Sequence, residues 1–144
     1  MIRLTNLADY AVVVMTAAAR EPGNKLSAAR VAEVTGIPAP TVAKLMGTLA
    51  RGGLLVASRG VAGGFSLALP PGDISVAAIV EAVDGPIALT NCLAGDAHDC
   101  AIEGHCGVRG HWGPINRAVR DALAAVTLAE LVLAPARAPQ RVEA

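Results

Sequence analysis

Three cysteines lie close together in one acidic stretch of the chain. Cys92, Cys100 and Cys106 are separated by seven and five residues, and the same stretch holds every histidine of the protein. The thiolate is the form of cysteine that binds metal, and loop residues can converge on one centre without helical spacing. Three thiolates and one histidine would satisfy zinc, and three thiolates with a weaker nitrogen or oxygen ligand would hold an iron-sulfur cluster. The spacing predicts a metal centre and leaves both kinds open.

Two other interpretations of these cysteines exist. They could be idle residues of an ordinary loop, or Cys100 or Cys106 could be a nucleophile activated by His105 or His98. No oxyanion motif and no phosphate-binding glycine loop accompanies these pairs. We therefore expect no enzyme and no catalytic residues.

The composition indicates helices packed around an aliphatic core. The chain has 144 residues, of which 53% are hydrophobic and only 2% aromatic, and its mean hydropathy is +0.51. This length suits one domain, and small aliphatic residues favour close-packed helices. Surplus hydrophobicity in so short a chain is typical of a subunit interface. We expect a mainly helical homodimer.

Charge is distributed unevenly along the chain. Residues 1–70 hold seven Lys and Arg against three Asp and Glu, whereas residues 71–112 hold one Arg against six acids. A basic first half fits a polyanionic partner such as nucleic acid. The acidic middle, which carries the cysteines, indicates a separate site.

Hydropathy and cysteine usage predict a cytoplasmic protein without membrane contact. The apolar run from Tyr10 to Ala19 has about half the length of a membrane span, and Glu130 interrupts the other candidate. An odd number of cysteines argues against a disulfide framework and favours reduced thiols or a metal site.

The first half has the pattern of a helix-turn-helix followed by a hairpin. Helical spacing predicts helices over 4–19, 28–35 and about 39–51, with Ser27 as an N-cap and Gly36 as a stop. Ala32, Gly36 and Val42 supply the small contact residue, the left-handed glycine and the β-branched core residue of the motif. Two apolar runs flanking 60–64 predict a β-hairpin with a glycine-rich tip. This order of elements is that of a winged helix.

On that interpretation, the third helix enters the major groove of double-stranded DNA. Thr41 and Lys44 are the candidates for reading base edges, and phosphate contacts fall to residues that position the module. The candidate DNA-binding residues are Lys25, Pro40, Thr41, Lys44, Thr48, Arg51 and Arg59.

The second half is predicted to hold a short helix over 76–83, an irregular cysteine segment, a long helix from Pro114 and a last short helix after Thr127. An apolar stripe that includes Ile115, Val119 and Leu123 marks the long helix, and Thr127 with Glu130 forms a capping box. We therefore divide the chain into a DNA-binding domain (1–70), a cluster-binding loop with a dimerisation helix (71–133) and a disordered tail (134–144).

Several of these stretches resemble one known family. The resemblance spans nearly the whole chain and is carried by residues 2–5 with 9–12, 39–44 and 59–65, and by the three cysteines before the long helix. The chain is similar to the Rrf-two family of iron-sulfur-dependent winged-helix regulators, which includes IscR, NsrR and RirA. Residues 85–92 and 116–123 look most like the branch that regulates the SUF iron-sulfur assembly system.

The resemblance implies a homodimer in which long helices, here about Gly113 to Val126, cross at the interface. It implies Cys92, Cys100 and Cys106 as ligands of an iron-sulfur cluster, 4Fe-4S being favoured over 2Fe-2S. The fourth ligand is implied to be Asp9 of the partner subunit, with His105 as the alternative, because Arg109 stands where some members have a histidine.

The function implied is that of a repressor of iron-sulfur assembly or of iron and redox homeostasis genes. Its operator is expected to be pseudo-palindromic, since the dimer is two-fold symmetric. The alternative is a zinc-binding or metal-free winged-helix repressor without cluster sensing.

Overall fold

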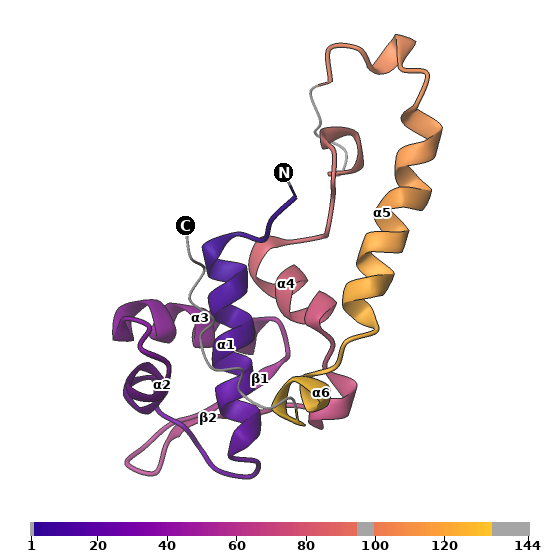
Figure 1. The fold of residues 1–144 in the computed structure, drawn as a ribbon. Coiled ribbons are helices and arrows are strands. Elements are labelled where there is room, and N and C mark those ends of the chain that lie inside the picture. The colour runs from indigo at the N-terminus through magenta and orange to yellow at the C-terminus, as the bar shows by residue number, and fades with distance from the viewer. Residues whose placement is uncertain (1, 95–99, 134–144) are drawn as a thin grey trace, which may run out of the picture.

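The computed structural model describes residues 2–94 and 100–133, and they form helices around one small hairpin (Figure 1). The helices are α1 (Asn6–Arg20), α2 (Ala28–Thr35), α3 (Ala39–Arg51), α4 (Val76–Asp84), α5 (Arg109–Ala124) and α6 (Leu128–Leu133). Strands β1 (Leu55–Ser58) and β2 (Gly64–Leu67) pair antiparallel, and short 3-10 turns lie at Pro71–Asp73 (η1), Asn91–Leu93 (η2) and Glu103–His105 (η3). The predicted fold class, mainly helical with a hairpin wing, is confirmed.

Side-chain caps set the starts of the early helices. Ser27 accepts a hydrogen bond from the amide of Arg30, and Ser75 accepts one from the amide of Ala78, as the sequence predicts. Thr5 caps α1 in the same way, so that this helix begins at Asn6 and not at Leu4.

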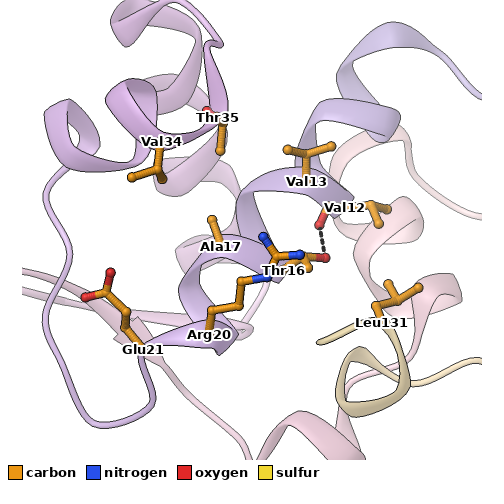
Figure 2. A pocket seen from close by; sticks show the side chains of 9 residues that line it. All are labelled: Val12, Val13, Thr16, Ala17, Arg20, Glu21, Val34, Thr35 and Leu131. Carbon is orange, nitrogen blue, oxygen red and sulfur yellow. Dashed lines mark hydrogen bonds between the residues drawn. The ribbon is translucent and has the colours of Figure 1, made fainter. Parts of the chain in front are cut away.

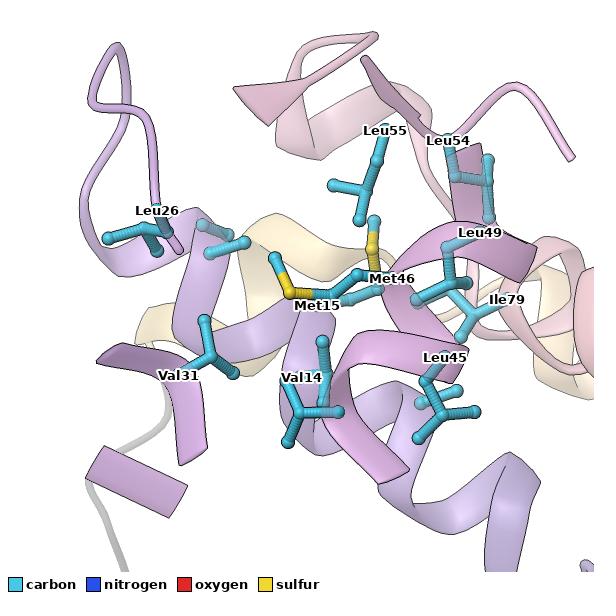
Figure 3. Close-up of a cluster of buried hydrophobic side chains, with 14 of the residues drawn as sticks. Val14, Met15, Leu26, Val31, Leu45, Met46, Leu49, Leu54, Leu55 and Ile79 are labelled. Carbon is cyan, nitrogen blue, oxygen red and sulfur yellow. The ribbon is translucent and has the colours of Figure 1, made fainter. Parts of the chain in front are cut away.

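The core is a cluster of aliphatic and methionine side chains around α1. This helix contacts α2, α3, α4 and α6. Met15 of α1 and Met46 and Leu49 of α3 lie in the cluster with no exposed surface (Figure 3). Ile79 from α4 and Leu128 from α6 belong to the same cluster. The core therefore continues past residue 70, although the domain boundaries at 70 and 133 remain predictions.

The long helix begins earlier than predicted. Helix α5 starts at Arg109, and Pro114 lies inside it. Pro114 is the sixth residue of the helix and has no amide hydrogen, so it removes the one hydrogen bond that an amide there would make to the carbonyl of Gly110. The turn before Pro114 is closed by the amide of His111, which donates to the carbonyl of Val108 at 2.9 Å. The proline therefore does not mark the helix start here.

Helix α5 stands out from the rest of the molecule (Figure 1). None of its residues is buried, and Ile115 of the predicted apolar stripe is 44% exposed. Its C-terminal end is fixed to α4, because the amide of Val76 donates to Val126 and that of Leu128 donates to Ile74. The predicted capping box is present, with the amide of Thr127 donating to Glu130 at 2.7 Å. The predicted disordered tail lies outside the described residues.

We predict that Leu128→Ala lowers the free energy of unfolding by about 2–5 kcal/mol, because it leaves a cavity between α6 and α1. Urea denaturation followed by circular dichroism measures the change. Leu133→Ala, at a side chain that is 82% exposed, is the control and should cost less than about 0.5 kcal/mol. Equal effects of the two substitutions would contradict this description of the core.

Candidate nucleic-acid interface and metal centre

Helices α2 and α3 form the predicted helix-turn-helix. Gly36 ends α2 in the left-handed conformation, with φ of 75°, and its amide donates to the carbonyl of Ala32. Val31 and Val42 are fully buried where the two helices meet α1. These contacts fix α3 on the surface of the core, with its polar side directed outward.

The predicted DNA-binding residues lie on α3, on the wing and on the segment before α2. Lys25, Pro40, Lys44, Arg51 and Arg59 are exposed, whereas Thr41 and Thr48 are half-buried. The Thr48 hydroxyl donates to the carbonyl of Lys44 at 3.0 Å and accepts from the Arg51 guanidinium at 3.1 Å. The Thr48 hydroxyl is therefore already bonded within α3, while the five exposed side chains are accessible.

The wing is anchored by a contact that the sequence analysis missed. Strands β1 and β2 pair with Ser58 opposite Gly64, and Leu26 forms a further bridge with Phe65, with amide-to-carbonyl distances of 2.8 and 2.9 Å. This bridge brings the neighbouring Lys25 beside the wing. One apolar residue between two polar ones shows no strand periodicity, so the sequence carried no signal for the bridge.

The three cysteines lie on the connector between α4 and α5. Each is a free thiol and half-buried. Cys92 belongs to η2, and its Sγ lies 3.1 Å from the hydroxyl oxygen of Thr90. Cys100 and Cys106 flank η3, with the carbonyl of Cys100 accepting from the amide of Glu103.

Three free thiols on one connector are the donor set that zinc or an iron-sulfur cluster takes. Among residues 2–94 and 100–133, no three His, Cys, Asp or Glu side chains stand close enough together to share a metal ion. Asp96, His98 and Asp99 fall outside the described residues. The chemistry of the cysteines thus fits a metal centre, and their ligand role remains a prediction.

The two candidate fourth ligands are both exposed. Asp9 lies in the first turn of α1, and His105 ends η3 directly before Cys106. Arg109, three residues after Cys106, forms an ion pair with Glu103 at 2.6 Å. This arginine is held by a carboxylate and offers no metal-binding nitrogen.

Helix α5 is joined to the connector by polar side chains. The Asn116 amide donates to the carbonyl of Ile87 at 2.8 Å and accepts from the amide of Leu89 at 3.0 Å. One turn further along α5, Arg120 forms a bidentate ion pair with Glu81 of α4, with nitrogen-to-oxygen distances of 2.8 and 3.0 Å. The hydrogen bond from Arg120 lowers the pKa of Glu81 below its ordinary value, against the opposing effect of burial.

A groove of about 490 Å³ lies between α1, α2 and α6 (Figure 2). Val13, Ala17 and Val34 supply apolar walls, and the Thr16 hydroxyl is bonded to the carbonyl of Val12 at 2.7 Å. The groove contains Arg20 and Glu21 but no cysteine or histidine. Its lining therefore has no part in the metal chemistry discussed above.

A helix-turn-helix followed by an antiparallel hairpin defines a winged-helix protein. Residues 4–134 match the model of the Rrf2 family, described as "Iron-dependent Transcriptional regulator". The chain belongs to this Rrf2 (Rrf-two) family.

Individual relatives agree with this assignment. The chain is 32% identical to the transcriptional repressor NsrR of Streptomyces coelicolor over 136 residues, which cover 93% of this chain and 90% of that protein. The structure of T. potens IscR matches at 25% identity with a TM-score of 0.69, over 96% of this chain and 93% of that one. CymR, the global cysteine regulator of B. subtilis, shares the fold, with a TM-score of 0.73 at 24% identity over 94% and 99% of the two chains.

The protein is therefore a transcriptional regulator and not an enzyme, as the sequence predicts. Within residues 2–94 and 100–133, no helix combines the length and the apolar character needed to cross a membrane.

We predict that Gly63→Ala destabilises the wing. A Cβ at this position would lie 2.5 Å from the carbonyl oxygen of Ser58 and 2.7 Å from that of Gly60, so the hairpin backbone must move, at a cost of about 1–3 kcal/mol. The free energy of unfolding in urea measures the effect. Gly72→Ala is the matched control because its Cβ meets open space; equal stabilities of the two variants would contradict the packing of the hairpin tip.

Proposed function

We propose that the protein is a homodimeric DNA-binding repressor that senses through an iron-sulfur cluster bound by Cys92, Cys100 and Cys106. The observation that carries the proposal is the position of three free thiols on a connector that is bonded to α5, in a chain that also holds a helix-turn-helix. The genes it controls would serve iron-sulfur assembly or iron and redox homeostasis. This target class follows from the resemblance of residues 85–92 and 116–123 to the SUF regulator branch.

The proposed DNA interface consists of α3, the wing and Lys25. Thr41 and Lys44 face base edges in the major groove, whereas Lys25, Thr48, Arg51 and Arg59 contact phosphates, and Pro40 lies at the start of the recognition helix. Support comes from the exposure of the four cationic side chains and from the basic balance of residues 1–70.

The proposed homodimer forms through α5. Helix α5 has no buried residue, and a groove of about 400 Å³ lies between the first residues, the end of α4 and α5. Leu4, Ile87 and Leu123 are among the apolar side chains that line it. An apolar helix face beside an apolar groove is typical of a subunit interface. A two-fold axis would give the operator its pseudo-palindromic form.

The proposed cluster takes its fourth ligand from Asp9 of the partner subunit, or from His105 of the same chain. We favour 4Fe-4S, with 2Fe-2S as the alternative. When bound, such a cluster supplies a redox-active centre whose potential depends on its ligands and on the hydrogen bonds to its sulfurs. The thiol of Cys92 already has a hydrogen-bonding neighbour in Thr90. The description of the family as iron-dependent supports this cofactor.

The alternative function is a winged-helix repressor that binds zinc or no metal. Three cysteines and one histidine suit zinc as well as they suit a cluster. The Streptomyces coelicolor relative NsrR is a transcriptional repressor, which supports repression under either alternative.

We predict that protein purified without oxygen absorbs broadly near roughly 400 nm and contains iron and sulfide in stoichiometric amounts. Cys92→Ala, Cys100→Ala and Cys106→Ala should each lose this absorbance, because each removes a thiolate ligand. Lys44→Ala, on α3, is the control and should keep it. A colourless protein that contains zinc, or that stays metal-free after reconstitution, would establish the alternative function.

We predict that Arg59→Ala weakens binding to all DNA sequences and reduces the slope of log affinity against log salt by roughly one unit, because one phosphate contact is lost. Fluorescence anisotropy over a salt series measures the slope. Arg20→Ala, at the end of α1, is the control and should leave the slope unchanged. An unchanged slope in Arg59→Ala would remove this residue from the interface.

A further inference from the structure

The segment that leads to Cys92 is hydrogen-bonded to a side chain of α5. The carbonyl of Ile87 accepts from the Asn116 amide at 2.8 Å. The amide of Leu89 also donates to Asn116, at 3.0 Å.

Asparagine suits this place because it offers a donor and an acceptor on one planar group. Aspartate would keep the acceptor for Leu89 and lose the donor for Ile87. Alanine would lose both bonds and leave two half-buried backbone groups without a partner, which costs more than the net value of the bonds themselves.

Polar contacts help to set the position of α5. The helix has no buried residue, and its half-buried Leu123 packs against Val76 and Val80 of α4. It contacts α4 and η2, the turn that contains Cys92. Its ion pair with α4 joins a half-exposed Arg120 to Glu81, and exposed pairs of this kind contribute little on their own. The bonds from Asn116, which are partly buried, are the more specific link.

Only two residues separate Leu89, which is bonded to Asn116, from Cys92, a span of at most about 11 Å of extended chain. Within that span, the Thr90 hydroxyl lies 3.1 Å from Cys92 Sγ. Because this segment is short and hydrogen-bonded, a change in the position of Cys92 is expected to move the backbone groups that are bonded to Asn116.

We propose that Asn116 is the positioning residue that ties Cys92 to α5, so that the placement of this thiol and the direction of the helix change together. The inference rests on the proposed function, in which Cys92 is a cluster ligand and α5 is the dimer helix. It assigns Asn116 a role in regulation without any contact with metal or DNA.

The first test uses the full-length, cluster-free chain and the alkylation rate of each cysteine, measured by mass spectrometry. Asn116→Ala should raise the alkylation rate of Cys92 about tenfold, and Asn116→Asp should raise it by a smaller factor because it keeps the bond to Leu89. Both variants should leave the alkylation rate of Cys106 within about twofold, because the lost bonds free only the Ile87–Leu89 side of the connector. Hydrogen exchange at the Leu89 amide should accelerate in Asn116→Ala. Arg117→Ala, at the next, exposed position of α5, is the control and should match the wild type in every measurement.

The second test compares DNA affinity with and without the cluster. The wild type should show different affinities in the two states, whereas in Asn116→Ala the ratio should fall toward one while iron and sulfide content stays at the wild-type level. A wild-type ratio in this variant, or unchanged Cys92 alkylation and Leu89 exchange, would overturn the inference and leave the proposed function standing. A wild type that takes up no cluster would overturn the proposed function, and with it the regulatory role of Asn116, even if the variants expose Cys92. Asn116→Asp keeps one bond and serves the same tests if Asn116→Ala does not fold.

Discussion

Burial of α1 is the constraint on which the other elements depend. Helices α2, α3, α4 and α6 all pack against this one helix, and Ala8, Ala11, Val14 and Met15 have no exposed surface. Small side chains at two of these four positions let the neighbouring helices approach closely. The same burial places α3 and the wing on one side of the core and the start of α4 on another. The recognition elements and the base of the regulatory half are thus positioned by two apolar clusters that both include residues of α1, without an aromatic residue among the buried side chains of the described part.

Helix α5 is held by polar contacts as well as by apolar packing. It has no fully buried side chain; Leu123 packs against the cluster of Ala8, Val76 and Val80, and Asn116 and Arg120 add hydrogen bonds and an ion pair. Polar contacts depend on direction and distance, so they can define one orientation of a helix that hydrophobic burial leaves free. A recognition module with a buried core, combined with a helix that has no fully buried side chain and lies next to the cysteines, suits the proposed regulator, in which the dimer geometry responds to ligand state. The proposed cluster site lies next to this contact between α5 and the connector.

Local signals in the sequence predicted most of the fold. Ser27, Gly36 and Ser75 act through neighbouring backbone groups, so their caps and stops could be inferred from the residue types alone. Pro114 misled because it is the sixth residue of α5 and does not end the helix there, although a proline is more usual in the first turn. The Leu26 bridge and the Asn116 bonds join residues far apart in the chain, and no periodicity or spacing marks such pairs. The cysteines could be recognised as candidate ligands by type, but their convergence depends on a connector that residue spacing does not determine.

The central claim is that α3 and the wing read a two-fold symmetric DNA site. Selection of binding sites from a random double-stranded library, carried out with cluster-loaded and cluster-free protein, tests it most directly. The account predicts enrichment of a pseudo-palindrome whose half-sites lie about one helical turn, or a multiple of it, apart, with unequal affinity in the two cluster states and loss of the preference in Lys44→Ala. Failure to enrich any sequence in either state would contradict the account.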